Sequence, residues 1–282
     1  MYINRKKIFI FIYCFLTSIN IYAAFTASAH NAHIRAWEKR DAKEALRQLE
    51  QIYPGPESEF SVYSPETENH LRFKNFYLAQ ELYFAYEKEE SVFTLYRLSR
   101  KLLNFGKETI QKYPQSPQGY AALGEFYANL PAIAGGSVTD AEVCFKKMMQ
   151  CKNITSFDFI RAVLFYLNVK KSYNESKRVI TDARTRLKKD ADLPFFTAYA
   201  DKWITYNEGV LAFYRGNFNE AALVFARFTE DHPLEFWSWF MLGETLRKSG
   251  KPYSEIHTRA FTLAEKAGAR ASVKVMKAMA AM

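Results

Sequence analysis

Residues 202–235 read KWITYNEGVLAFYRGNFNEAALVFARFTEDHPLE and contain the clearest helical pattern of the chain. It divides into two amphipathic helices joined at Arg215-Gly216-Asn217. In the first helix, Gly209 leaves room for a neighbouring helix to approach closely. The second helix has apolar side chains at i, i+4 and i+7, the spacing of one helix face: Ala221, Phe225 and Phe228. Pro233 then ends the pair, so the stretch predicts a helical hairpin.

The same glycine spacing occurs again further along the chain, because glycines 209 and 216 recur at 243 and 250. The second copy covers residues 236–268. The two shifts are equal and match the tetratricopeptide period of about 34, and the small residue in the first helix, the glycine turn and the terminal proline belong to the same pattern. The two segments resemble tetratricopeptide repeats, with these residues on consensus positions: Ala221, Phe225, Pro233, Leu242 and Gly243.

A third copy is expected at residues 117–150, with an interruption. Ser116-Pro117 begins its first helix, and its second helix repeats the apolar spacing at Ala141, Phe145 and Met148. The separation between the small residue of the first helix and the alanine of the second is 141 − 124 = 17 in this copy. In the later copy it is 221 − 209 = 12, so five residues are inserted. The insertion loop contains Pro131, Gly135 and Gly136.

The glycine pair of this loop raises the question of a phosphate site. A phosphate-binding loop needs its glycines after a strand and a Lys followed by Ser or Thr, and the segment NLPAIAGGSVTDAEVCF has neither. We therefore interpret it as an insertion between two helices. A glycine supplies a positive φ, while Ser137 or Thr139 caps the second helix with Asp140 in its first turn.

The rest of the chain extends the helical pattern. A degenerate copy is expected at residues 157–190, and residues 42–112 are helical by periodicity, with a loop or linker at Pro54–Pro65. We predict an all-α fold: a right-handed superhelix of tetratricopeptide-like hairpins with extra N-terminal helices and a C-terminal capping helix. This forms one domain over residues 30–282.

The first 29 residues have the layout of an export signal. Arg5, Lys6 and Lys7 precede an apolar run, and a small-residue tail ends in Ala27-Ser28-Ala29. We expect cleavage after Ala29 and a periplasmic or secreted protein. The alternative is an uncleaved segment that anchors the chain to the inner membrane.

The net charge bears on the class of partner, and the cysteine spacing bears on a disulfide. The net charge of +9 falls to 9 − 3 = +6 without the three N-terminal cations. The remaining basic residues are typical of solvated helix faces, so we expect no nucleic-acid partner.

Cys144 and Cys151 lie seven residues apart, which on a continuous helix favours two part-buried thiols. A disulfide bridge requires the helix to end near Gln150.

No catalytic or metal-binding pattern stands out. The five histidines form no HExxH arrangement and no cysteine cluster, and there is no GxSxG elbow. We predict a protein that is not an enzyme and has no cofactor.

Stacked helical hairpins bind through the face lined by their first helices. The inward positions of the last two copies predict a binding surface that is aromatic with a charged end: Trp203, Tyr206, Val210, Phe213, Trp237, Phe240, Glu244 and Arg247. We expect about half of these rings to pack between neighbouring repeats, because aromatic stripes at helical spacing are more often core.

One resemblance is more specific. The Leu130-Pro131, Gly135-Gly136, Ala141 and Phe145 pattern in an exported repeat protein resembles the periplasmic T component associated with tripartite ATP-independent periplasmic (TRAP) transporters. The resemblance implies an oligomer that associates with a periplasmic solute-binding protein and handles an apolar organic acid. Many members are lipoproteins, whereas Cys14 follows Ile12-Tyr13 rather than small residues. This departure argues against a lipid-modified cysteine and against membrane tethering through one.

The alternative function is a generic envelope or secreted scaffold that binds peptides or assembly partners without a small ligand. It requires only the repeats, since a fold does not imply a function.

Overall fold

The computed structural model describes residues 44, 47, 63–190 and 194–281. Over these residues the secondary structure is helical, which confirms the all-α prediction, and no strand occurs among them. The expected signal peptide, residues 42–52 apart from 44 and 47, and most of the Pro54–Pro65 loop lie outside the described residues.

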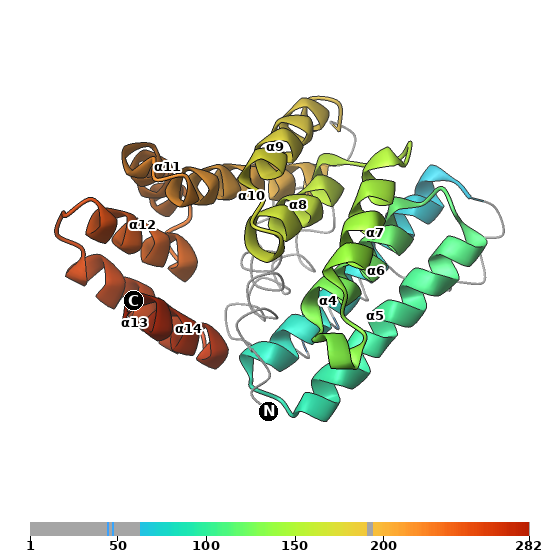
Figure 1. Cartoon of the computed structure of the whole chain (residues 1–282), viewed down its shortest axis with the longest axis horizontal. Coiled ribbons are helices and arrows are strands. Elements are labelled where there is room, and N and C mark those ends of the chain that lie inside the picture. Colours follow the sequence, from blue (N-terminus) through green and yellow to red (C-terminus); the bar gives the residue numbers. More distant parts are fainter. Residues whose placement is uncertain (1–43, 45–46, 48–62, 191–193, 282) are drawn as a thin grey trace.

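The helices follow one another as antiparallel pairs joined by short turns (Figure 1). The pairs are α4 (Pro65–Glu87) with α5 (Val92–Lys112), α6 (Pro117–Asn129) with α7 (Val138–Gln150), α8 (Ser156–Leu164) with α9 (Tyr173–Leu187), α10 (Pro194–Tyr214) with α11 (Phe218–Asp231), and α12 (Phe236–Lys248) with α13 (Ser254–Lys266). Helix α14 (Arg270–Ala280) follows.

Local sequence explains where several helices begin and end. Ser64, Ser91, Ser116 and Ser137 each accept a backbone N–H of the following turn, as N-cap residues do. The turns after α10 and α12 contain Gly216 and Gly250 with φ of +78° and +69°, which only glycine adopts without strain. The predicted caps and glycine turns of these hairpins are therefore observed.

Two elements differ from the sequence expectation. Helix α10 begins at Pro194, well before Lys202, because proline is accommodated in the first turn of a helix. Helix α8 continues as a π-helical segment, η3 (Phe165–Val169), which is followed by Lys171 with φ +54°. The additional turns of α10 carry Tyr199, whose ring is buried in the core.

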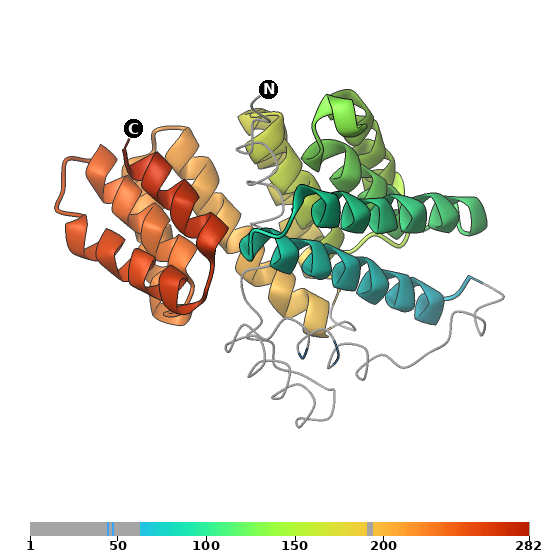
Figure 2. The same cartoon turned by 90° about the horizontal axis from the view of Figure 1, so that it is seen from below.

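Each pair packs on the next, and the succession bends round until its two ends meet. Helix α14 packs against α13 and also against α4, so the last described helix contacts the first (Figure 2). Ser272 donates its backbone N–H and its hydroxyl to the Glu87 carboxylate, and Lys274 pairs with Glu89.

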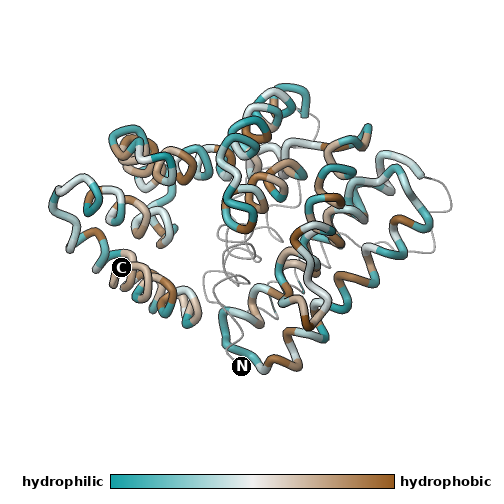
Figure 3. Tube along the Cα trace, viewed as in Figure 1, coloured by the Kyte–Doolittle hydropathy of each residue, from teal (hydrophilic) through white to brown (hydrophobic). Residues whose placement is uncertain are grey.

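Apolar and polar positions alternate around most helices (Figure 3). The apolar faces meet in one large core and one small cluster between α4, α5 and α6. The bulkiest fully buried members of the large core include Trp203, Tyr166, Tyr199, Phe145 and Phe225. The core thus runs through successive pairs and positions the rings of α10 at its centre.

Candidate functional site

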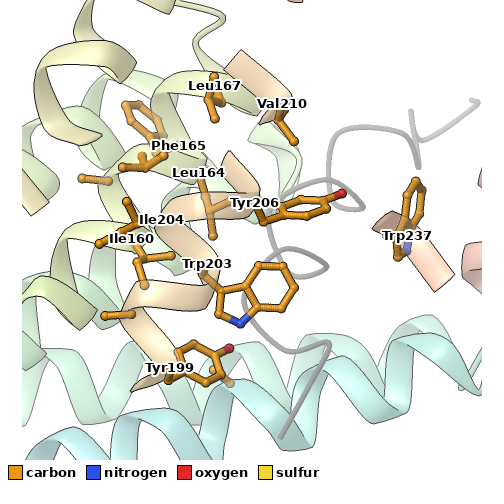
Figure 4. Packing of buried hydrophobic residues seen from close by; sticks show 14 of the residues in the cluster. Ile160, Leu164, Phe165, Leu167, Tyr199, Trp203, Ile204, Tyr206, Val210 and Trp237 are labelled. Atoms are coloured by element: carbon orange, nitrogen blue, oxygen red, sulfur yellow. The ribbon is translucent and has the colours of Figure 1, made fainter. Parts of the chain in front are cut away.

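The structure brings the predicted residues of α10 together in one aromatic row. Trp203 and Tyr206 are buried, and their rings meet edge to face with centroids 5.2 Å apart. Figure 4 shows Trp203 and Tyr206 projecting from α10 toward the same side, with Trp237 of α12 facing them. Val210 is buried further along α10, whereas Phe213 is half-buried and packs on Phe218.

The predicted residues of α12 divide between two environments. Trp237 lies edge to face on Phe240 at 5.5 Å. Phe240 stacks on His257 of α13 at 5.1 Å, so its ring fills the space within the hairpin. Glu244 is buried and accepts hydrogen bonds from Arg247 (2.8 Å), with His257 Nε2 at 3.3 Å. The charged end of the predicted surface is thus an ion pair that is satisfied within the α12–α13 hairpin.

The aromatic row extends beyond the predicted residues. The Tyr199 ring lies edge to face on Phe157 of α8 at 5.3 Å and on Phe76 of α4 at 5.7 Å. We call Phe76, Phe157, Tyr199, Trp203 and Tyr206 the inner aromatic row. Sequence reasoning missed the first three, although the run HLRFKNFYLAQELYFAYEK signalled a buried aromatic face on α4.

One polar group of the row and one on α4 are among the buried groups that have no hydrogen-bond partner in the described part of the chain. The Nε1–H of Trp203 is buried without a hydrogen-bond acceptor, and so are both ends of the Gln80 amide. Gln80 lies one turn after Phe76 and therefore on the same face of α4. Buried polar groups are normally hydrogen-bonded, so both groups are exceptions within the described core.

A buried lysine borders the row. Lys202 Nζ lies 5.6 Å from the Trp203 ring centroid, 5.7 Å from that of Phe228 and 3.9 Å from the Glu235 carboxylate. Burial lowers the pKa of Lys202 to about 8 despite the attraction of Glu235. Burial and the charge of Lys202 lower the pKa of His232 to about 4, so this imidazole is neutral at neutral pH.

A buried ion network joins α4, α6 and α8 beneath the row. Arg72 lies 3.3 Å from Asp158 and 3.2 Å from Glu68. Gln118 donates to Asp158 (2.8 Å) and to Glu68 (3.0 Å), and Asp158 also accepts from the Thr155 backbone N–H at 2.9 Å. Asp158 therefore caps its own helix and holds two others, which explains its complete burial.

The environment separates the acidities of these carboxyl groups. Burial alone would raise the pKa of Asp158, but Arg72 and Arg161 outweigh burial and lower it. Burial raises the pKa of Glu125 to about 7, although Arg161 lies 3.4 Å away. Asp158 is thus ionised at neutral pH, whereas Glu125 titrates near it.

The insertion loop lies at the end of the α6–α7 hairpin opposite to Gln118. Pro131 begins a 3-10 turn, η2 (Ala132–Ala134), and Gly135 follows with φ +93°. A Cβ on Gly136 would lie 1.7 Å from the Leu130 carbonyl oxygen, so the loop has no room for a side chain there. The loop forms a turn between two helices and contributes nothing to the inner aromatic row.

The two described cysteines are free thiols. Helix α7 ends at Gln150, yet Cys144 is buried and Cys151 half-buried without a bridge. Burial raises the pKa of both thiols to about 11, so neither is a thiolate at neutral pH. Over the described ranges, no group of three His, Cys, Asp or Glu side chains is arranged to hold a metal ion.

Comparison of this chain with protein-family models, with curated proteins and with solved structures found no match. Within residues 63–190 and 194–281, no helix combines the length and the apolar character that crossing a membrane requires.

Proposed function

We propose that this chain is a non-catalytic binding protein built as a tetratricopeptide-like right-handed superhelix, and that it binds through the inner aromatic row. In this proposal it serves a TRAP-type solute transport system after export, where it associates with a periplasmic solute-binding protein and contacts an apolar organic acid. The functional assignment rests on the sequence resemblance, and the binding surface rests on the structure.

One observation carries the binding surface: an apolar row of rings that contains polar groups with no partner in the described part of the chain. Ligand sites are mostly apolar, with a few convergent polar groups that fix orientation. The Trp203 Nε1–H and the Gln80 amide supply donors and an acceptor, and the neighbouring rings supply the apolar walls. An organic acid with an apolar body matches both features.

The test is affinity capture of the tagged full chain from its native envelope fraction, with mass spectrometry of proteins and of extracted small molecules. Recovery of a solute-binding protein together with an organic acid supports the transporter function. Recovery of assembly factors or envelope peptides, without a solute-binding protein, contradicts it and leaves the envelope scaffold.

A further inference from the structure

A group of exposed apolar side chains lies at one end of the α4–α7 helices, away from the inner aromatic row. Phe93, in the first turn of α5, is 76% exposed, and Ile133, in the η2 turn, is also 76% exposed. We call this group the apolar tip; its other exposed members are Val92, Tyr96 and Val138.

The packing of α5 on α6 brings these residues to the same level. A Cβ on Gly106 would lie 2.8 Å from Leu123 and 3.0 Å from the Gly119 carbonyl, so position 106 lies opposite a point midway between these two residues. Phe93 precedes this contact along α5 by nearly as many residues as Ile133 follows it along α6 and the loop. Because the helices are antiparallel, both residues lie at the same end, as Figure 1 shows for η2 and the start of α5.

The insertion loop is built to hold Ile133 outward. The Ser137 backbone N–H donates to the Tyr127 carbonyl at 2.9 Å, and the Gly136 N–H donates to the Pro131 carbonyl at 3.0 Å. The chain therefore folds back on itself on either side of the η2 turn. One exposed apolar side chain is ordinary, whereas several gathered at one end of neighbouring helices mark an interaction surface.

Positive charge surrounds the tip. On residues 88–101, 131–140 and 270–277, which include the α14 helix packed on α4, the acids are Glu89, Glu90 and Asp140. The cations are Lys88, Arg97, Arg100, Lys101, Arg270, Lys274 and Lys277. Glu81 pairs with Lys101 and Glu87 accepts from Ser272, so with these two acids the net charge is 7 − 5 = +2. Within the described part of the chain, Arg97 and Arg100 are exposed on the face of α5 that also carries Phe93 and Tyr96, and neither forms an ion pair.

We infer that the apolar tip docks on an anionic lipid surface. Phe93 and Ile133 enter the boundary between headgroups and acyl chains, Tyr96 lies at the headgroup level, and Arg97 and Arg100, one and two turns after Phe93, meet the lipid phosphates. Apolar groups at the front and cations behind them are the arrangement of proteins that bind the membrane interface. The docking places the inner aromatic row at a membrane without any spanning segment from the described helices.

The experiment measures membrane entry at single positions of the full chain. In a background with Cys14→Ser and Cys151→Ser, the variants Phe93→Cys, Ile133→Cys and Leu223→Cys are labelled with nitrobenzoxadiazole. Leu223 is 75% exposed on α11 and is the matched control. Because the readout belongs to the labelled position, a contribution of the N-terminal segment to binding does not obscure it.

Addition of vesicles containing phosphatidylglycerol should raise the emission several-fold and shift it to the blue at positions 93 and 133, with no change at 223. Arg97→Glu with Arg100→Glu should abolish the response, whereas Lys188→Glu with Lys189→Glu, exposed just after α9, should preserve it. An absent response at 93 and 133, an equal response at 223, or an equal response to pure phosphatidylcholine overturns the inference. A response that needs no vesicles and rises with protein concentration also overturns it, since it identifies a second copy as the occupant.

Discussion

Gly243 has no room for a side chain, because a Cβ there would lie 2.2 Å from His257 Cδ2. The same imidazole stacks on Phe240 and faces Glu244, so a displacement of His257 disturbs the whole α12–α13 contact. Gly250, in the turn of the same hairpin, has nothing within 4 Å of its virtual Cβ. At the residue scale, the α12–α13 hairpin therefore needs a small residue at 243, whereas at 250 it needs the positive φ of glycine.

We predict that Gly243→Ala lowers the free energy of unfolding by ~1–3 kcal/mol, the usual cost of overpacking a filled core. Urea denaturation measures it. His257→Ala removes the obstructing ring, so the double variant should be less unstable than the sum of the two single variants. Strict additivity would contradict the assignment of the clash to His257.

Glu125 gives a pH dependence whose sign is fixed by its burial. Its pKa is raised from 4.5 to about 7 in the folded chain, so the folded state binds the proton more tightly than the unfolded state between those values. The stabilisation from this group is complete below pH 4.5 and is lost as the pH rises through 7.

Glu125→Gln imitates the protonated form and should have little effect on stability at pH 5. At pH 8 it should be more stable than the original chain, by ~1 kcal/mol or more. Urea unfolding of both proteins at the two pH values measures the change. The same pH dependence in both proteins would show that another group titrates.

At the element scale, the ion network determines how α4, α6 and α8 meet. Its partners are far apart in sequence, since Arg72 and Asp158 are 86 residues apart, and each is fully desolvated. Removing one member of a buried pair leaves the other charge uncompensated, whereas exposed pairs contribute little. The packing of three helices thus depends on a pairing that no local pattern reveals.

Arg72→Met should therefore lower the free energy of unfolding by ~3–5 kcal/mol. The control is Arg178→Met, which removes exposed pairs with Glu175 and Asp182, both at 3.1 Å on α9, and should cost ~0–1 kcal/mol. Thermal and urea unfolding compare the two. Equal losses would contradict a structural role of the buried network.

The sequence predicted the helices and turns better than it predicted the contacts between hairpins. The helices of the later hairpins, their glycine turns and the Ser116 and Ser137 caps follow from local chemistry. The partners of Tyr199 and Asp158 come from other hairpins, where spacing carries no information. Trp203 and Tyr206 were expected in an aromatic row and lie in one. Phe240 and Glu244 were expected on the same surface but contact His257 within the α12–α13 hairpin.

At the scale of the whole molecule, α14 returns to α4 and joins the two ends of the described chain. Ser272 and Glu87 are 185 residues apart, and the serine hydroxyl and backbone N–H both reach the buried carboxylate. A hydrogen bond to a buried charged group contributes more than an ordinary one. This contact holds the succession of hairpins closed around the inner aromatic row.

Ser272→Ala should accelerate amide hydrogen exchange in α14 at least several-fold, because local opening of that helix loses a bond to a buried charge. Exchange in α8 should be unchanged. Ser254→Ala, at an exposed serine that begins α13, is the control. Unchanged exchange in α14 would show that the closure does not depend on Ser272.

The inner aromatic row is the proposed ligand site, and one matched pair of variants tests binding there. Trp203→Phe keeps an aromatic ring and removes the unpaired Nε1–H. Trp239→Phe makes the same change where Nε1 already donates to the Pro233 carbonyl at 2.9 Å.

Each tagged full chain is captured from the envelope fraction, and the small molecule extracted per mole of protein is quantified, with circular dichroism to confirm folding. We predict a several-fold loss for Trp203→Phe and no loss for Trp239→Phe. Equal retention in both variants, or no small molecule in the original protein, would contradict binding at the row.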